Sequence, residues 1–334
     1  MQRVLWAALT ALCLAGAAPA DAADPLVLQL KWLPDAQFAG YYVAAAKGFY
    51  RDAGLDVTIK PGGPDINPSQ VLAAGGADVA VDWLASALVA RDRGVPEVNI
   101  AQIFQHSGLQ LTCRRDSGVR RPADLKGKTL AVWFAGNEYP FLAWMAKLGL
   151  STGGTKPDVT VLRQDAGVRL LVEGRAACIS TMSYNEYWQV IDAGLKPSQL
   201  VVFRYDDEGV ATLEDGLYAL PATIADPVKL DRLARIVRAS VAGWRYAAAP
   251  AHQAEAVGIV VKHSAGDAAD PRQAARMLRE VAKLVANKEH GLGYLEPAAY
   301  ERTARVLLSA ANPVIRNKPE GAWTHAIWDR AFAR

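Results

Sequence analysis

The residue types in this chain that could do chemistry are tryptophans, tyrosines and carboxylates that recur at the ends of strand-like runs. Trp32 ends an alternating apolar run that begins at Leu26, and Asp82 and Trp83 close a second apolar run. An indole ring offers a flat apolar wall, and a carboxylate accepts hydrogen bonds from amines and ring N–H groups. These residue types at strand ends predict a site for a planar molecule that carries hydrogen-bond donors.

Tyr41 is a further aromatic candidate, in the alanine-rich helical segment that follows Trp32. Each of these residues also has a structural interpretation. Trp32 and Tyr41 could pack beneath that helix, and Asp82 could cap the helix that follows it, since aspartate is a favoured N-cap residue. The residue types alone leave both interpretations open.

The turn after the strand expected at 129–133 carries Gly136, Asn137 and Glu138. A glycine turn before a helix lets backbone N–H groups point at a ligand, and a helix N-terminus favours an anion. Glu138 at this place repels an anion and favours an amine. The structural alternative is that Asn137 caps the helix while Glu138 complements its dipole.

Tyr184 and Glu186 follow a later strand-like run. They could face Trp32 and Asp82 across a cleft, or they could begin an amphipathic helix. Glu208 lies in an acidic run near an expected domain crossing. It could reach the same ligand, although a run of acids is usually a solvated loop.

Metal and cofactor chemistry find no support in the sequence. His106 is the only histidine in the first 250 residues, and no partner lies at ligand spacing from it. We expect no metal, no cofactor and no catalytic residue.

Alternating strands and helices must position these residues. The segment 26–63 predicts a strand, a helix and a second strand, of the length that a parallel crossover needs. The alternation continues, and it predicts two α/β lobes, each with a mixed, mainly parallel sheet and helices on both faces. We expect lobe 1 to hold 23–112 and 214–334, with C-terminal helices covering its sheet, and lobe 2 to hold 113–213. Two crossings would leave a hinged cleft between the lobes.

The N-terminus has the pattern of a secretory signal peptide over residues 1–22, with Arg3, an apolar run and small residues that end at Ala22. This pattern predicts export to the periplasm. In that oxidising compartment Cys113 and Cys178 could pair, but two cysteines in apolar, strand-like contexts do not make a disulfide framework. We expect two buried free thiols.

The composition is that of a folded globular protein. Of 334 residues, 51% are hydrophobic and 21% are charged, which argues against disorder. A net charge of +3, with no basic run, argues against a nucleic-acid partner. At this length, two domains are the expectation.

A family resemblance extends from the first strand to about Tyr218. The chain resembles the pyrimidine-precursor (thiamine biosynthesis) family of periplasmic binding proteins, the solute receptors of ABC importers, in Lys31-Trp32, Lys47-Gly48-Phe49-Tyr50, Gly54-Leu55-Asp56-Val57 and Asp124-Leu125-Lys126-Gly127-Lys128. The resemblance implies the two-lobe periplasmic-binding-protein fold of type II and an inner-membrane ABC permease as partner. It also implies a heterocyclic ligand such as a formyl-aminopyrimidine, or riboflavin. We further expect the chain to be a monomer.

Two alternatives remain open. One branch of this family, the thiamine pyrimidine synthases, uses its own lysine and histidine as reactants, whereas this chain has Asp82 and Ser86 at the matching positions and no cysteine run near 210–214. Because those reagents are missing, we expect no enzyme activity. The other alternative, a sulfonate or taurine-type anion receptor, would need arginine or backbone donors where Glu138 and Asp82 stand.

Overall fold

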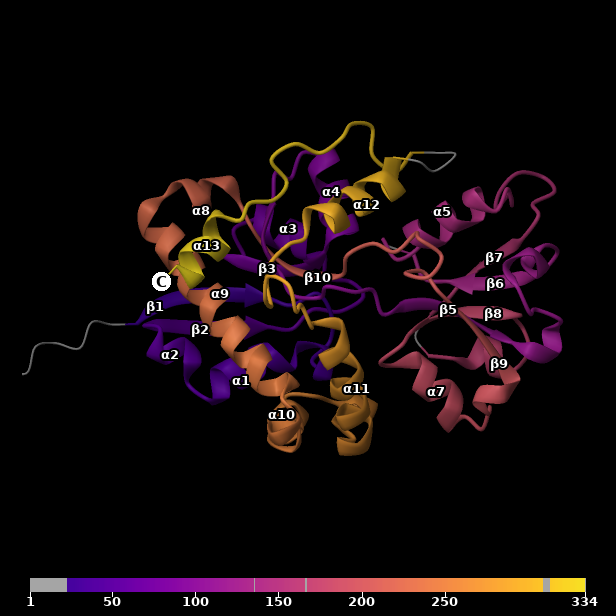
Figure 1. Ribbon diagram of the computed structural model, residues 1–334, viewed down its shortest axis with the longest axis horizontal. Helices are drawn as coiled ribbons and strands as arrows, with labels where there is room; N and C mark the ends of the chain where they lie inside the picture. Colours follow the sequence, from indigo (N-terminus) through magenta and orange to yellow (C-terminus); the bar gives the residue numbers. More distant parts are fainter. Residues whose placement is uncertain (1–22, 135, 166, 309–312, 334) are drawn as a thin grey trace, which may run out of the picture.

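Two five-stranded sheets form the centres of two lobes that lie side by side (Figure 1). The computed structural model describes residues 23–134, 136–165, 167–308 and 313–333. The expected signal peptide, residues 1–22, lies outside the described residues. The predicted two-lobe α/β architecture is confirmed.

Lobe 1 has the strand order β2-β1-β3-β10-β4. In lobe 1, β1 pairs in parallel with β2 and β3, while β10 runs antiparallel between β3 and β4. Every residue of β3, β4 and β10 is buried, because helices cover both faces of this sheet. The strands are β1 (Asp24–Gln29), β2 (Leu55–Lys60), β3 (Val79–Trp83), β4 (Val98–Gln102) and β10 (Asp215–Ala219).

Lobe 2 repeats this arrangement with the order β7-β6-β8-β5-β9. Here β6 pairs in parallel with β7 and β8, and β5 runs antiparallel between β8 and β9. The strands are β5 (Leu109–Arg114), β6 (Thr129–Val132), β7 (Thr160–Arg163), β8 (Cys178–Met182) and β9 (Leu200–Arg204).

Each of the two crossings leads into a strand that runs antiparallel to its neighbours in the sheet of the other lobe. β5 leaves lobe 1 and joins lobe 2, and β10 makes the return. The expected lobe boundary after residue 112 is therefore corrected: the first crossing lies at 103–108, and 109–112 belong to lobe 2. The apolar run of β5 suits either sheet, and only its hydrogen-bond partners decide which sheet it joins.

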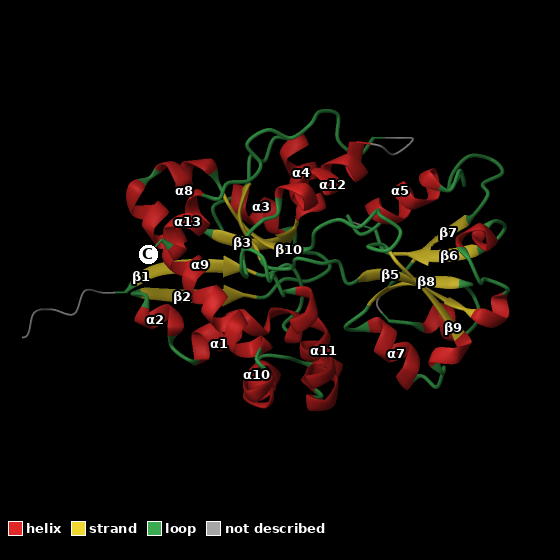
Figure 2. Cartoon of the chain, viewed as in Figure 1, coloured by secondary structure: helices red, strands yellow, loops and turns green. Residues whose placement is uncertain are grey.

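Helices lie on both faces of each sheet (Figure 2). The α-helices in the described part of lobe 2 are α5 (Tyr139–Lys147), α6 (Arg169–Val172) and α7 (Glu186–Asp192). The others belong to lobe 1: α1 (Ala39–Ala46), α2 (Phe49–Asp52), α3 (Pro68–Ala73), α4 (Leu84–Asp92), α8 (Pro221–Ala225), α9 (Pro227–Ala248), α10 (Gln253–Val261), α11 (Pro271–Leu284), α12 (Pro297–Leu308) and α13 (Ala326–Phe332). None of the helices in the described part of the chain is long and apolar enough to cross a membrane.

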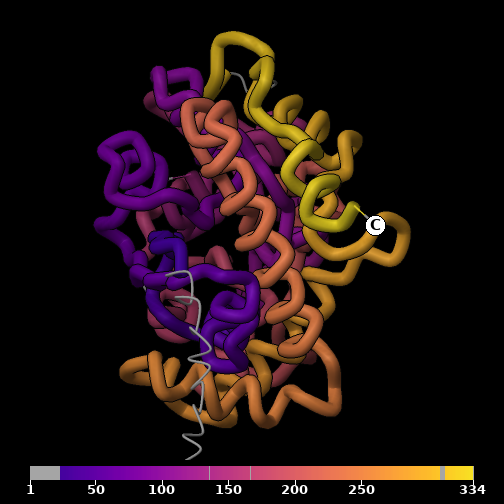
Figure 3. Tube along the Cα trace, turned by 90° about the vertical axis from the view of Figure 1, so that its left-hand side faces the viewer, coloured from indigo at the N-terminus to yellow at the C-terminus, as the bar shows by residue number. Residues whose placement is uncertain are grey.

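The longest helix, α9, packs directly on α1, and α13 lies beside α9 (Figure 3). Glycines make the close approach of α1 and α9 possible. A Cβ on Gly243 would lie 2.1 Å from the Gly40 carbonyl oxygen, and a Cβ on Gly40 would lie 2.2 Å from the Trp244 ring. α9 also contacts β2, and α13 contacts β4.

Cys113 and Cys178 form a disulfide. They stand opposite each other in the antiparallel register of β5 and β8, and both are buried. The expectation of two free thiols is therefore wrong. The pairing of two strands that are distant in sequence brings the sulfur atoms together, and spacing along the chain gives no sign of it.

Candidate ligand-binding site

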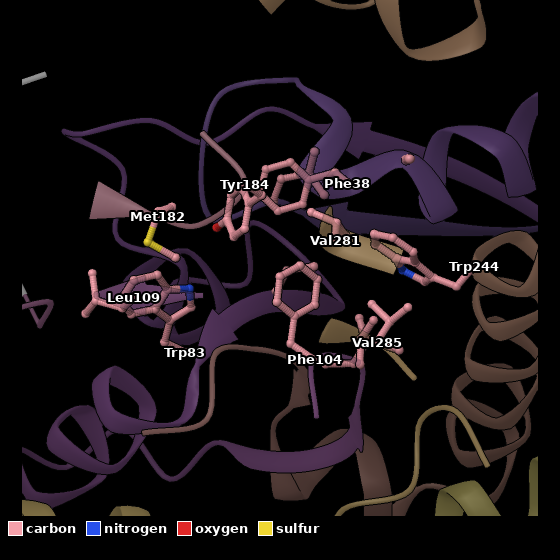
Figure 4. Close-up of a cluster of buried hydrophobic side chains, with 14 of the residues drawn as sticks. Phe38, Trp83, Phe104, Leu109, Met182, Tyr184, Trp244, Val281 and Val285 are labelled. Atoms are coloured by element: carbon pink, nitrogen blue, oxygen red, sulfur yellow. The ribbon is translucent and has the colours of Figure 1, made fainter. Parts of the chain in front are cut away.

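Side chains from both lobes meet where the strand ends of the two sheets face each other. Trp83 and Phe104 of lobe 1 lie near Met182 and Tyr184 of lobe 2 in Figure 4. The rings of Phe104 and Tyr184 are 6.3 Å apart and pack edge to face. All four side chains are buried. The lobes are therefore joined by an aromatic cluster of the kind that can enclose a flat ligand.

Asp215, the first residue of β10, is the polar centre of this cluster. Its Oδ1 accepts a hydrogen bond from Trp83 Nε1 at 2.8 Å, and its Oδ2 accepts one from Gln37 Nε2 at 2.9 Å. The backbone N–H of Gln37 donates to Asp35 Oδ1 at 2.8 Å. The return crossing thus places a carboxylate against an indole that lies 132 positions away in the chain.

Glu186 is the corresponding carboxylate of lobe 2, at the start of α7. Its Oε2 accepts from the backbone N–H of Met182 at 3.0 Å, and its Oε1 accepts from Asn185 Nδ2 at 2.8 Å. These bonds hold the carboxylate in the turn after β8. Tyr184 and Glu186 come after β8, and Glu186 begins α7. That they face Trp32 and Asp82 across a cleft stays a prediction.

Three buried carboxylates therefore share the boundary between the lobes. Burial raises the pKa of Asp35, Asp215 and Glu186 to about 7. The charges of Asp215 and Glu186 raise the pKa of Asp35 further, so both lie within electrostatic reach of Asp35. None of the hydrogen bonds that these three side chains make within the described residues comes from a lysine or arginine.

Asp82 lies one residue before Trp83 and forms an ion pair with Lys31. Lys31 Nζ is 2.6 Å from Asp82 Oδ1 and 5.3 Å from the centre of the Trp83 ring. Asp82 Oδ1 also accepts from the Trp83 backbone N–H at 2.7 Å. The capping alternative for Asp82 is not observed, because the N-cap of α4 is Trp83 and makes no side-chain cap.

Trp32 lies at the surface, outside the buried cluster. It is 39% exposed, and its carbonyl oxygen accepts from the Gly62 N–H at 2.9 Å. Four of the large apolar side chains that stand exposed lie in loops after strands: Trp32, Leu33, Ile66 and Phe134. Exposed aromatic rings at such places are available to a ligand.

Tyr41 is fully buried in the core of lobe 1 and packs edge to face on Trp244, with ring centres 5.7 Å apart. The structural interpretation of Tyr41, in which it packs beneath the first helix, therefore describes its position.

Asn137 and Glu138 form a turn of their own. Glu138 Oε2 accepts from the Gly136 N–H, and Asn137 Nδ2 donates to the Phe134 carbonyl oxygen, each at 2.8 Å. The structural alternative, a cap by Asn137, is not observed, since the N-cap of α5 is Glu138 without a side-chain bond. This turn faces lobe 1, because a Cβ on Gly136 would lie 2.6 Å from Ser86 Oγ. Burial raises the pKa of Glu138.

Glu208 lies in the second crossing and accepts hydrogen bonds from α5 of lobe 2. Its Oε2 accepts from Trp144 Nε1 at 3.0 Å, and its carbonyl oxygen accepts from Lys147 Nζ at 2.6 Å. The carboxylate is thus engaged with α5. Asp206 and Asp207 are exposed, as the solvated-loop alternative for this acidic run expects, whereas Glu208 is half-buried.

Glu214 connects the two crossings and was not among the expected site residues. Its Oε1 accepts from Ser107 Oγ at 2.6 Å, from the Gly108 N–H at 2.9 Å and from the Leu109 N–H at 3.0 Å. One side chain of the return segment therefore holds the outgoing segment in place. Burial raises the pKa of Glu214 to about 8.

Lys31, Asp35 and Asp215 are the other residues that sequence reasoning missed. Lys31 and Asp35 flank Trp32 and could have been found from the rule that placed Trp32 at a strand end. Asp215 had no such signal, because its role depends on the pairing of β10 with β3.

A group of metal-ligand type also occurs, on the loop between α11 and α12. Donor atoms of Glu289, His290 and Glu296 lie within 4.8 Å of one another. His290 Nδ1 and Glu296 Oε1 are hydrogen-bonded at 2.8 Å, which accounts for their closeness.

The two sheets have the same topology, and the chain crosses between the lobes twice. Aromatic and acidic side chains lie where the lobes meet. This architecture is that of two-lobe α/β proteins with the periplasmic-binding-protein fold. The family described as NMT1/THI5 like has a sequence model that matches residues 35–256. The chain belongs to this family.

Comparisons with individual proteins agree with this family. The chain is 27% identical over 313 residues to the riboflavin-binding protein RibY of Chloroflexus aurantiacus, with 88% of this chain and 84% of RibY covered. It is 28% identical over 171 residues to the formylaminopyrimidine-binding protein of Halalkalibacterium halodurans, with half of each chain covered (50% and 50%). In structure it is similar to the periplasmic sulfonate-binding protein SsuA from Methylobacillus flagellatus, with a TM-score of 0.65, 13% identity, and 92% and 94% of the two chains covered.

Proposed function

We propose that this protein is the solute receptor of an ABC importer and that it binds a small aromatic heterocycle with N–H donors between its lobes. One observation carries this proposal: Asp215 accepts a hydrogen bond from Trp83, and Asp35, Asp215 and Glu186, from both lobes, all lie within electrostatic reach of Tyr184.

The chemistry of the carboxylates supports this ligand class. A buried carboxylate is costly unless hydrogen bonds or an opposite charge compensate it. Repulsion among three such groups adds to that cost and is relieved by an amine or by ring N–H donors. Trp83 and Tyr184 supply flat faces for stacking, which adds about 0.5–1.5 kcal/mol beyond the burial of area.

The names of two relatives suggest two candidate ligands. A formyl-aminopyrimidine presents an exocyclic amine to the carboxylates, and it is the ligand named for the Halalkalibacterium halodurans relative. Riboflavin, the ligand named for RibY, has a larger flat ring and ring N–H donors. The strongly acidic boundary favours the aminopyrimidine.

We further propose that the protein does not convert its ligand. Asp82 and Ser86 stand where the synthase branch of the family has its reactive lysine and histidine. Asp82 is bound to Lys31 and Ser69, so it serves as an acceptor within lobe 1. A sulfonate receptor is the second candidate, and the surplus of carboxylates over cations at the boundary argues against it.

Fluorescence titration tests the proposal, because Trp83 lies in the cluster. The mature protein is titrated with a formylated aminomethyl aminopyrimidine, with riboflavin and with taurine. We expect quenching or a spectral shift with micromolar or tighter affinity for a heterocycle, and none with taurine. Tight binding of taurine without binding of either heterocycle would overturn the proposal.

The same proposal includes a periplasmic location, a monomeric state and an inner-membrane permease as partner. A permease that takes up the ligand in vesicles only when this protein is present would support it. Uptake that is independent of this protein would contradict it.

A further inference from the structure

A buried chain of polar side chains runs from the strand ends of lobe 1 into its interior. It begins at Lys31, passes through Asp82 and Ser69, and ends at Glu97, which precedes β4. Ser69 Oγ is 3.2 Å from Asp82 Oδ2 and 2.5 Å from Glu97 Oε1. Glu97 has no exposed surface, and Ser69 and Asp82 are each 1% exposed.

The Ser69 hydroxyl limits how many hydrogen bonds this row of polar side chains can make. A serine hydroxyl carries one hydrogen and has lone pairs that accept others. Ser69 lies within hydrogen-bond distance of one carboxyl oxygen of Asp82 and one of Glu97. Its single proton cannot satisfy two ionised carboxylates at once. One of the two acids must therefore bring a proton of its own and donate it to Ser69 Oγ.

The partners of each acid decide which one is protonated. Asp82 faces a cation, since it accepts from Lys31 Nζ and also from the Trp83 N–H, which is the environment of a carboxylate. Glu97 Oε2 is buried and has no partner among the described residues. Burial, and next the charge of Asp82, raises the pKa of Glu97 to about 8.

The other groups near Glu97 do not supply a direct ion pair. Arg91 donates from Nη1 to the backbone carbonyl of Glu97 at 2.7 Å, and its charge, like that of Lys31, acts on the carboxyl from further away. The hydroxyl of Tyr218, on β10, lies within electrostatic reach of both Glu97 and Asp82.

We propose that Glu97 is a neutral acid that donates its proton to Ser69, and that Ser69 in turn donates to Asp82 and fixes it for Lys31 and the ligand. Glu97 is thus a positioning residue, which acts on the ligand site through two others. When Glu97 ionises, two carboxylates compete for one hydroxyl proton, and Asp82 loses its hydrogen bond or its position beside Lys31.

The first test needs no ligand and compares Glu97→Gln with the wild type. Glutamine keeps a donor toward Ser69 and cannot ionise. A carboxyl whose pKa is raised on folding stabilises the protein fully below its unfolded pKa, and this stability is lost as pH rises to the folded pKa. Relative to Glu97→Gln, the wild-type folding equilibrium constant should fall about tenfold per pH unit between roughly pH 4.5 and 8. The exposed variant Glu301→Gln is the control and should keep the wild-type profile.

Infrared spectroscopy gives a second measurement on the wild type, in case a variant fails to fold. A protonated carboxyl band at neutral pH that disappears above pH 8, and that is weaker by one carboxyl group in Glu97→Gln, supports the proposal. The band that remains in the variant belongs to Glu214 and the boundary carboxylates, whose pKa values are also raised. Parallel pH profiles for wild type and Glu97→Gln, or no protonated carboxyl in the wild type, would overturn it.

The second test rests on the proposed function, because it measures ligand affinity. With the heterocycle that binds at pH 7, the ratio of wild-type affinity to Glu97→Gln affinity should fall severalfold between pH 7 and 9, since the boundary carboxylates ionise in both proteins over this range. Ser69→Ala should bind more weakly than Glu97→Gln at both pH values. Equal pH dependence in wild type and Glu97→Gln would refute the positioning role. If no heterocycle binds at any pH, the proposed function fails, while the stability test still decides the protonation of Glu97.

Discussion

At the scale of single residues, the boundary between the lobes holds buried acidic side chains. An ordinary protein interface would be apolar there, or each buried charge would have a partner of opposite charge. Asp35, Asp215 and Glu186 are buried together, and burial raises the pKa of each to about 7. Such an arrangement costs stability without a ligand and gains it back on binding a donor. We interpret the three carboxylates as the groups that give the site its specificity.

The variants Glu186→Gln and Asp35→Asn test this interpretation. Each removes one buried charge, so the ligand-free protein should be equally stable or more stable at pH 8 in urea denaturation. Each also removes a charge-assisted hydrogen bond to the ligand, which should weaken binding by about 1.5–3 kcal/mol. The exposed residue Glu173 provides the control variant, Glu173→Gln. Unchanged affinity in both site variants, measured by calorimetry, would exclude these carboxylates from the site.

The sequence pointed to some of these residues and gave no sign of others. Asp82 and Trp83 end β3, and Tyr184 and Glu186 come soon after β8, so the rule that ligands bind at the ends of strands singled them out. Asp215 could not be predicted from the sequence, because only the long-range pairing of β10 and β3 brings it to Trp83. Residue types also could not separate Trp32, which is exposed, from Tyr41, which lies in the core.

At the scale of elements, the crossing strand β5 is held to lobe 2 both by hydrogen bonds and by a covalent bond. Cys113 lies on β5 and Cys178 on β8, 65 positions apart. The alternation of strands and helices predicted the lobes, but neither the disulfide nor the sheet that β5 joins. Both depend on which strands pair, and pairing is decided by the whole fold and not by local pattern.

The double variant Cys113→Ala/Cys178→Ala should be less stable by about 2–4 kcal/mol in urea denaturation, because closing a long loop covalently restricts the unfolded chain. Treatment of the native wild type with a mild reductant serves as the control, and it should have little effect because both cysteines are fully buried. A double variant as stable as the wild type would mean that the bond contributes nothing to folding.

At the scale of the whole molecule, the lobes touch outside the aromatic cluster through α11 of lobe 1 and α7 of lobe 2. Arg276 Nη1 lies 2.9 Å from Asp192 Oδ1, Nη2 contacts the second carboxylate oxygen, and the guanidinium lies 5.5 Å from the centre of the Trp188 ring. Gln273 Nε2 donates to Asn185 Oδ1 at 3.3 Å. These contacts join the two lobes directly, so they stabilise the arrangement of the lobes in this structure relative to one in which the lobes are apart.

Arg276→Ala should therefore shift the ligand-free protein toward an open form. A partly exposed ion pair of this kind contributes about 1 kcal/mol or less, which corresponds to roughly a fivefold change in the ratio of closed to open molecules. Small-angle scattering should show a larger radius of gyration, and the apparent ligand affinity should fall by no more than the closed population does. Arg272→Ala, one helical turn away on a side chain that is 91% exposed, is the matched control and should change neither quantity. If Arg276→Ala scatters like the wild type and binds with equal affinity, the contact between α11 and α7 does not bias closure, and the crossings at 103–108 and 205–214 alone must set the balance between the two states.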